Sequence, residues 1–302
     1  MTYSAGNTIL DDDYNGFKDS INTMWSTGSG SAGYGQTAVA AVAAGSTITA
    51  TQWATLLSRI SSAASHQGTS ITSITNPSAG ATISAYAALA GNITSVTGTN
   101  RLNAAANGGD SSANTTTTAG WAASASTTKT ITFASANAKR WFFNAGGMIR
   151  MSWARSGGTA SAQNTSWTNL LGAAGTIVVT GAASSKTIAG VAYTGTSKKG
   201  GSGSPTTLAT TTGADVIGGA VTIFKQLGAQ YLYTTNYINV NASGSSTNIS
   251  FAVTLIDNDA PAGPDSVNGT LTMTTTIRPP STTYVSAAWG SVTQNSAAWS
   301  VS

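Results

Sequence analysis

The sequence lacks several residue types on which enzymes commonly depend. Its 302 residues contain no cysteine, a single histidine, and nine acidic residues that are all aspartate. Without cysteine there is no disulfide, no thiol nucleophile and no thiolate zinc site. A Ser-His-Asp triad would have to use His66 as its base, and no GxSxG nucleophile motif accompanies it. These absences favour a protein that is not an enzyme.

Charged side chains are also scarce. They make up 7% of the chain, against about 25% in an average soluble domain. The formal net charge is +4, and the basic residues are spread along the sequence in runs of at most two. Nucleic-acid binding calls for a clustered basic stripe, so nucleic acid is not expected as a partner. Neither a secretory signal nor an apolar stretch of membrane-spanning length is found, so we expect cytoplasmic synthesis and no membrane insertion.

Small residues dominate what remains. The chain has 50 threonines, 50 alanines, 40 serines and 34 glycines. Alanine supplies much of the 40% hydrophobic content, which predicts a thin core that self-association would help to complete. Disordered chains are poor in aromatic and β-branched residues, whereas this sequence is 8% aromatic and rich in threonine. The composition therefore favours β-structure.

The first hundred residues show the 3.6-residue periodicity of amphipathic helices. One helix is expected to begin at the three aspartates at 11–13, whose charges favour a helix N-terminus. A second begins at Thr49, which stands three residues before Gln52 as in a capping box, and a third spans 82–96. Residues 1–102 are expected to form a small helical bundle that serves as an attachment and assembly region.

The rest of the chain shows the two-residue periodicity of strands, after a stretch rich in small polar residues at 103–126 that is expected to be a linker. A short helix is expected at 164–171. The predicted fold class is α+β, mainly β, with an antiparallel β-sandwich of jelly-roll type at 127–280. A tail at 281–302 is expected to dock on this or a neighbouring subunit. The expected strands are 128–134, 140–144, 147–155, 176–180, 187–194, 220–225, 231–241, 248–256 and 270–277.

Two local patterns resemble known sites without completing one. The GxGxxG run at 28–33 follows a helix instead of a strand, so it is expected to be a loop. Asp257, Asn258, Asp259 and Asp265 could supply oxygen ligands for Ca²⁺, but their spacing misses the EF-hand pattern and such residues are common in turns. The same aspartates are the candidates for a polysaccharide depolymerase. That alternative is weakened because a general acid normally lies in a buried cleft.

Large side chains are the remaining candidates for function. His66 is expected to have a structural role at a helix end, either capping carbonyls or bonding a neighbouring segment. Trp141, Phe142 and Phe143 are candidates for packing in the β-domain or for a ligand-facing platform. We expect no catalytic, cofactor or metal residue. The candidates for assembly contacts are Tyr14, Phe17, Trp25, Trp53, His66, Trp289 and Trp299.

Several short motifs occur in a fixed order along the chain. The helical region contains Asp13-Tyr14-Asn15, Tyr34-Gly35-Gln36, Ile48-Thr49 before Trp53 and Leu56, and His66-Gln67. The β-region contains WFFNAGGMIR at 141–150 and Asp265 with NGTL at 268–271. In this order the motifs resemble virion structural proteins of tailed bacteriophages, the tail-fibre or tail-associated proteins of cyanophage type. The chain departs from that group at 103–126 and after Pro280.

The resemblance implies a non-enzymatic, multimeric component of the virion. Its N-terminal part would anchor to other tail, neck or baseplate proteins, and we expect a homotrimer or a higher oligomer. A tail or neck fibre protein is favoured, which would present its β-sandwich to other virion proteins or to host surface polysaccharide. The alternative is a baseplate, collar or capsid decoration protein. No cofactor is expected.

Overall fold

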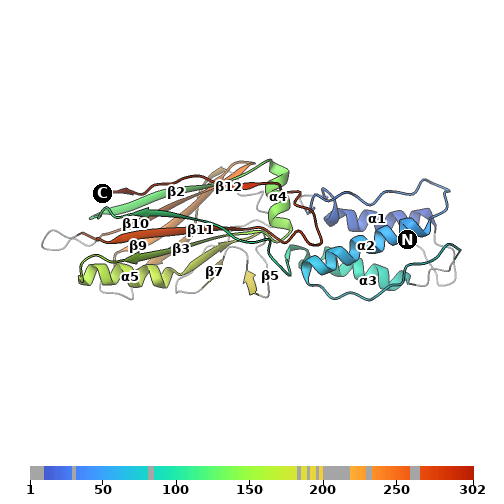
Figure 1. Cartoon of the computed structure of the whole chain (residues 1–302), viewed down its shortest axis with the longest axis horizontal. Coiled ribbons are helices and arrows are strands. Elements are labelled where there is room, and N and C mark those ends of the chain that lie inside the picture. The colour runs from blue at the N-terminus through green and yellow to red at the C-terminus, as the bar shows by residue number, and fades with distance from the viewer. Residues whose placement is uncertain are drawn as a thin grey trace.

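The computed structural model describes residues 10–28, 32–80, 85–181, 185–188, 191–194, 197–199, 218–228, 233–258 and 266–302. The molecule is elongated, with three helices at one end and the sheets at the other (Figure 1). The fold is a mixed α+β fold, as expected, but helix and strand contribute nearly equal shares, so strands do not dominate. Within the described residues, none of the helices combines the length and apolar character that crossing a bilayer requires.

The helical end contains the three expected helices. They are α1 (Asp11–Trp25), α2 (Ala50–Gln67) and α3 (Tyr86–Thr97), followed by a short 3-10 helix, η1 (Thr99–Leu102). The predicted capping box is confirmed, because Gln52 N donates to Thr49 Oγ1 at 3.2 Å and Thr49 N donates to Gln52 Oε1 at 2.8 Å. Gly68 ends α2 in a left-handed conformation, which favours glycine.

All three helices run in the same direction. Near their N-termini the rings of Tyr14 and Trp53 meet edge to face, with centroids 5.7 Å apart. Near their C-termini the Gln67 side chain donates to the Val96 carbonyl at 2.9 Å. Parallel helices cannot be joined by short turns, because the chain must travel back the length of a helix each time. It does so in two extended segments, at 36–48 and 69–80.

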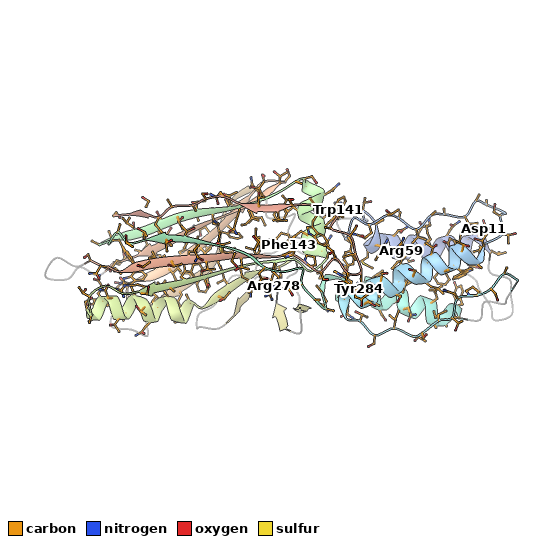
Figure 2. All side chains as sticks on the ribbon, viewed as in Figure 1. Asp11, Arg59, Trp141, Phe143, Arg278 and Tyr284 are labelled. Carbon is orange, nitrogen blue, oxygen red and sulfur yellow. The ribbon has the colours of Figure 1, made fainter. Side chains whose placement is uncertain are left out.

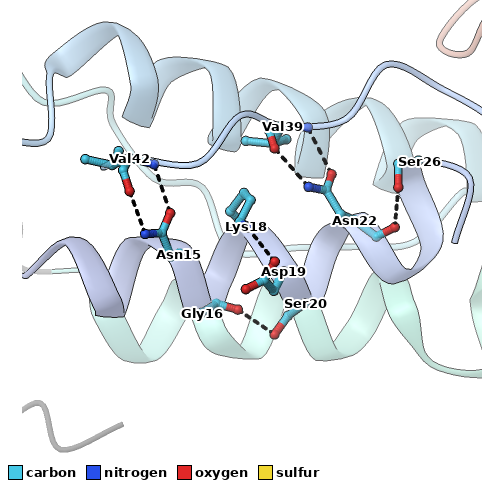
Figure 3. Close-up of polar contacts among 9 residues, drawn as sticks. All are labelled: Asn15, Gly16, Lys18, Asp19, Ser20, Asn22, Ser26, Val39 and Val42. Atoms are coloured by element: carbon cyan, nitrogen blue, oxygen red, sulfur yellow. Dashed lines mark hydrogen bonds and ion pairs between the residues drawn. The ribbon is translucent and has the colours of Figure 1, made fainter. Parts of the chain in front are cut away.

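Asparagine side chains hold these extended segments against the helices. Asn22 donates to the Val39 carbonyl and accepts from the Val39 amide, both at 2.9 Å, and Asn15 bonds Val42 in the same way (Figure 3). Asn92 of α3 does the same for Thr72. Within the first segment every third residue is buried, at 36, 39 and 42. This is the period of a polyproline II helix, which has no internal hydrogen bonds, so the asparagines supply partners that the backbone lacks.

The helical region is built from an internal repeat that the sequence analysis missed. The pattern Ala-Gly-x-Thr-Ile occurs at 5–9, 44–48 and 79–83, each time before a helix. Its second and third glycines, Gly45 and Gly80, both lie in turns with φ near +73° and +79°, and positions 5–9 and 81–84 lie outside the described residues. Each helix then repeats apolar residues at heptad spacing: Tyr14, Phe17, Ile21, Met24; Trp53, Leu56, Ile60, Ala63; Tyr86, Leu89, Ile93, Val96.

The other end of the molecule contains two larger antiparallel sheets and a two-stranded one, among the described residues. The first has the order β1 (Ser111–Thr117), β11 (Thr270–Arg278), β3 (Met148–Ser156), β4 (Thr176–Val179), β7 (Ser197–Lys199). The second has the order β12 (Val292–Gln294), β2 (Ser124–Phe133), β10 (Asn248–Ile256), β9 (Tyr237–Gly244), β8 (Gly218–Leu227), with β13 (Ser300–Val301) also on β2. The two-stranded sheet joins β5 (Ser185–Ile188) and β6 (Val191–Thr194).

The larger sheets bury their alternate residues, as the periodicity predicted. In β10 the side chains of Ile249, Phe251, Val253 and Leu255 are all fully buried. The rings of Trp153, from the first sheet, and Phe224, from the second, stack with centroids 6.3 Å apart. Helix α5 (Ala162–Ala174), predicted at 164–171, packs against β3 of one sheet and against β8 and β9 of the other.

Three predictions made for this part of the chain are wrong. The expected linker at 103–126 contains β1, an edge strand on β11, and the buried Trp121. Ser, Thr and Asn occur in linkers, but here they also form the polar face of a strand. Residues 140–144 belong to a helix, α4 (Ala136–Asn144), because Ser135 caps it by accepting from Ala138 N at 3.0 Å. The strand expected at 187–194 is divided between β5 and β6.

Candidate functional site

The candidate site is the junction where the helical region meets the sheets. The C-terminal ends of the parallel helices, η1, α4 and the start of the tail come together there (Figure 1). Asp11 lies at the end of the helices that is far from the sheets (Figure 2). Trp141, which belongs to α4, lies at the opposite end, where the helices meet the sheets. Three of the motifs that carry the resemblance, at 34–36, 66–67 and 141–150, contribute residues to this junction.

Tyr34 and Gln67 form the centre of the junction on the helical side. Tyr34 is fully buried; its hydroxyl donates to the Arg101 carbonyl and accepts from Gln67 Nε2 at 2.9 Å. Burial raises the pKa of the Tyr34 hydroxyl far above its ordinary value, although the Gln67 hydrogen bond and the Arg101 charge oppose that shift. The hydroxyl therefore remains a neutral donor, and it ties the segment after α1 to α2 and η1.

His66 joins α2 to the end of α4. Its imidazole is 2% exposed, and its Nε2 lies 2.8 Å from the Ala145 carbonyl oxygen. Because a carbonyl only accepts, Nε2 carries the proton. Burial lowers the pKa of the imidazole, against the effect of the Ala145 hydrogen bond, which raises it. Of the two structural roles expected for His66, the side chain fills the second, a bond to a neighbouring segment.

Trp141 is seated on the backbone of the helical region. Gly35 has φ of +73°, and a Cβ added there would lie 2.4 Å from Trp141 Cδ2. Two further bonds attach α4 to the chain that follows α1: Asn144 Nδ2 donates to the Gly33 carbonyl at 3.0 Å, and Arg140 Nη2 donates to the Thr27 carbonyl at 3.3 Å. Glycine is therefore required at position 35 for two reasons, namely the left-handed backbone conformation and the close approach of the Trp141 indole.

Gln36 attaches the helical region to the tail. Its Nε2 donates to the Ser286 carbonyl at 3.0 Å, and its Oε1 accepts from the Ser286 amide at 2.8 Å and from the Ser286 hydroxyl at 2.7 Å. The two residues are 250 positions apart in the sequence. This contact has the same bidentate form as the asparagine contacts within the helical region.

The tail, residues 281–302, docks on its own chain. β12 and β13 pair with β2, and two inward-facing side chains of β2 bind the tail backbone: Lys129 Nζ donates to the Asn295 carbonyl at 2.6 Å, and Thr127 Oγ1 to the Ala298 carbonyl at 2.8 Å. Trp299 Nε1 donates to the Thr115 carbonyl of β1 at 2.9 Å, which links the tail to the other sheet. The tail therefore bridges one side of the gap between the sheets.

The aromatic residues predicted to make assembly contacts pack within a single chain. Tyr14, Phe17, Trp25 and Trp53 are buried in the helical region, and Trp289 is buried in the tail. Phe142 and Phe143 are fully buried and meet each other and Phe133. Among these candidate residues, Trp141 and Trp299 are half-buried and keep part of their surface accessible. Side chains already covered within the chain offer little surface to a second copy, so packing explains their placement.

Of the aspartates considered for Ca²⁺ or for catalysis, the structure describes Asp257. Asp257 is buried, and its Oδ2 accepts from Gln163 Nε2 at 2.6 Å and from Trp167 Nε1 at 3.1 Å, so it anchors α5. Asp259 and Asp265 lie outside the described residues. Within the part of the chain that the structure describes, no three His or Asp side chains are placed to share a metal ion.

The junction contacts named above are hydrogen bonds from neutral amides, hydroxyls and an imidazole, with Arg140 as the charged exception. Such an arrangement can fix two parts of a chain relative to each other. Sequence reasoning marked His66 and Trp141, but it gave no role to Gln36, Gln67 or Asn144, whose partners are far away in the sequence.

Comparison of the chain with protein-family models, with curated proteins and with solved structures finds no match.

Proposed function

We propose that this chain is a non-enzymatic structural component of a tailed-phage virion, most specifically a tail or neck fibre protein. The observation that carries the proposal is the convergence of the motifs at 34–36, 66–67 and 141–150 on one buried junction. These are the residues by which the chain resembles phage virion proteins, and a joint between an anchoring region and a presenting region needs contacts of this kind. The elongated shape is compatible with a fibre (Figure 1).

The β-region would be the presenting part. We propose that its two larger sheets form a β-sandwich of jelly-roll type, which the stacking of Trp153 on Phe224 supports. Outward-facing positions of β2 and β10 carry hydroxyl groups, for example Thr130 and Ser250, whose oxygens are 2.9 Å apart. A face of neutral hydroxyls can approach other virion proteins or host surface polysaccharide without charge repulsion and without the much larger penalty of desolvating charged groups.

The helical region would be the anchor, and the assembly a homotrimer or a higher oligomer. The buried aromatic residues give this oligomer no support, since they are covered within one chain. Its support is the neutral, threonine-rich surface, which lets identical copies pack side by side. Light scattering of the purified full chain at micromolar concentration should give at least three times the monomer mass; a stable monomer would contradict the oligomer.

Antibody labelling of intact particles by electron microscopy tests the virion role. Gold label on the tail or neck is expected, with particles of an unrelated phage as the control. Label on the capsid would favour the decoration alternative, and absence of label from particles that infect normally would overturn the virion role. A glycan array probed with the full chain then separates a host-binding fibre from an architectural one.

A further inference from the structure

We propose that the junction is an acid-sensitive coupling between the helical region and the sheets, with the His66 imidazole as its sensor. This property belongs to the single chain and does not depend on the virion role. His66 is the one histidine of the sequence, and the chain has no cysteine. Because ordinary aspartates titrate near pH 4 and tyrosine and lysine near pH 10, His66 is the side chain whose ordinary pKa lies between pH 5 and 8.

The position of His66 makes its protonation state matter. The residue is 2% exposed; its ring meets the Tyr34 ring edge to face, with centroids 5.5 Å apart, and bonds the Ala145 carbonyl at the end of α4. The backbone of the same residue accepts from the Ala105 amide at 2.7 Å. His66 thus touches the segment after α1, the chain after η1 and the end of α4, which are the parts that must stay together for the two regions to be coupled.

The surroundings disfavour a charged imidazole. The ionisable groups of the adjacent segments are Tyr34, Arg101 of η1, and Lys139 and Arg140 of α4, none of which is a carboxylate, and α2 itself carries Arg59. Helix α1, which also packs on α2, carries aspartates at 11–13 and the Lys18–Asp19 ion pair, all of which precede its last turn, the end that lies near His66. Two features act in the other direction, namely the C-terminus of α2, whose dipole favours a cation, and the Ala145 carbonyl. Burial outweighs them, and the pKa of His66 in the folded chain lies below its ordinary value.

The direction of the pH effect follows from linkage. With the folded pKa lowered, an open junction binds a proton at a pH where the closed junction does not. The free energy that favours the closed junction over the open one is therefore largest above the ordinary histidine pKa of about 6.5, and it decreases as the pH falls below that value. Between the two pKa values the ratio of closed to open forms falls about tenfold for each pH unit.

Hydrogen exchange of the full chain tests this coupling. Protection factors, which correct for the pH dependence of intrinsic exchange, should fall between pH 7 and 5 at the amides of Ala105 and Ser286, whose acceptors are the His66 carbonyl and Gln36 Oε1. Those of Val253 in β10 should stay constant. The His66→Gln variant keeps an amide donor for the Ala145 carbonyl but cannot titrate, so its junction protection should not change over this range. Equal acid loss in wild type and variant, or none in the wild type, would overturn the proposal.

A second measurement keeps the test decisive if the variant fails to fold. Because the chain has one histidine, its imidazole Cε1–H gives a single resonance whose titration reports the pKa of His66 directly. A midpoint below 6.5 that coincides with the loss of junction protection supports the coupling. A midpoint at or above 6.5 contradicts it.

Discussion

The helical region and the sheets satisfy their backbones by different means. In the sheets the amides and carbonyls pair strand to strand, so that β2 and β10 match nine residues in unbroken register. In the helical region the extended segments described at 36–48 and 69–80 are not paired as strands, and single side chains such as Asn15, Asn22 and Asn92 supply both bonds at once. The sheets therefore spread the hydrogen bonding of their backbone over many equivalent contacts. In the extended segments of the helical region, the backbone hydrogen bonding depends on a few side chains.

The largest expected effect is the loss of packing between the sheets. Phe251 of β10 is fully buried, so Phe251→Ala should lower the free energy of unfolding by about 3–5 kcal/mol. The control is its neighbour, Ser250→Ala, on the outward face, which should change it by about 0.5 kcal/mol or less. Urea unfolding measures both. Equal losses would mean that the burial pattern of β10 does not describe the core.

The next effect distinguishes the two regions directly. Asn22→Ala removes both bonds to Val39 and should cost about 1–3 kcal/mol, because a backbone amide and a carbonyl lose their partner. Asn239→Ala changes the same residue type in β9, where the backbone pairs with its neighbours, and should cost about 0.5 kcal/mol or less. If unfolding experiments gave the two variants similar losses, the contrast between the regions would be wrong.

The internal repeat makes a prediction of intermediate size. Gly45 and Gly80 have the same left-handed conformation, and a Cβ at either would meet open space. Changing each to alanine should therefore cost the same, about 1–2 kcal/mol. Gly91→Ala is the control, since Gly91 lies in α3 with open space around it, and alanine should add about 0.5–1 kcal/mol there. Unequal losses at Gly45 and Gly80 would show that the two turns are not equivalent.

The smallest effect concerns the pH response of the sheets. Arg278 and Arg150 both form ion pairs with Asp110. The pKa of the Asp110 carboxyl is lowered, and the main cause is the hydrogen bond from Arg278. The contribution to stability is thus present above the ordinary aspartate pKa and is lost as the pH falls through the lowered value. Since these three side chains remain partly exposed, we expect about 0–1 kcal/mol. Asp110→Asn should remove it at pH 6, and the difference between variant and wild type should shrink as the pH falls below the ordinary aspartate pKa of about 4, as thermal unfolding would show.

Periodicity and capping predicted the regular elements well. The 3.6-residue periodicity and the Thr49 capping box placed the helices, and alternation placed β10 and β11. The errors arose where two local signals conflict. The aromatic residues at 141–143 favour a strand, but the Ser135 cap favours a helix, and the helix forms. The small polar residues of β1 are typical of a linker, and only their pairing with β11, for example Thr116 with Thr272, makes them a strand.

The site itself was less predictable, because its bonds join distant parts of the chain. Nothing near Gln36 in the sequence identifies Ser286 as its partner, and Gln67 meets Tyr34 only after three helices have packed in parallel. Two signals could have been found earlier. The threefold recurrence of Ala-Gly-x-Thr-Ile, and the valines at 39 and 42, spaced by three, were both visible in the sequence.

If the junction couples the helices to the sheets, the two parts should unfold as one unit. Gly35 and Gly45 share φ of +73°, but a Cβ reaches Trp141 only at Gly35, so Gly45→Ala carries the same backbone strain without the junction contact. The direct measurement is urea unfolding followed separately in α2 and β10 by hydrogen exchange and mass spectrometry. Coincident midpoints are predicted for wild type and Gly45→Ala, and separate midpoints for Gly35→Ala. Separate midpoints in the wild type, or coincident midpoints in Gly35→Ala at the wild-type urea concentration, would show that the junction does not couple the two parts.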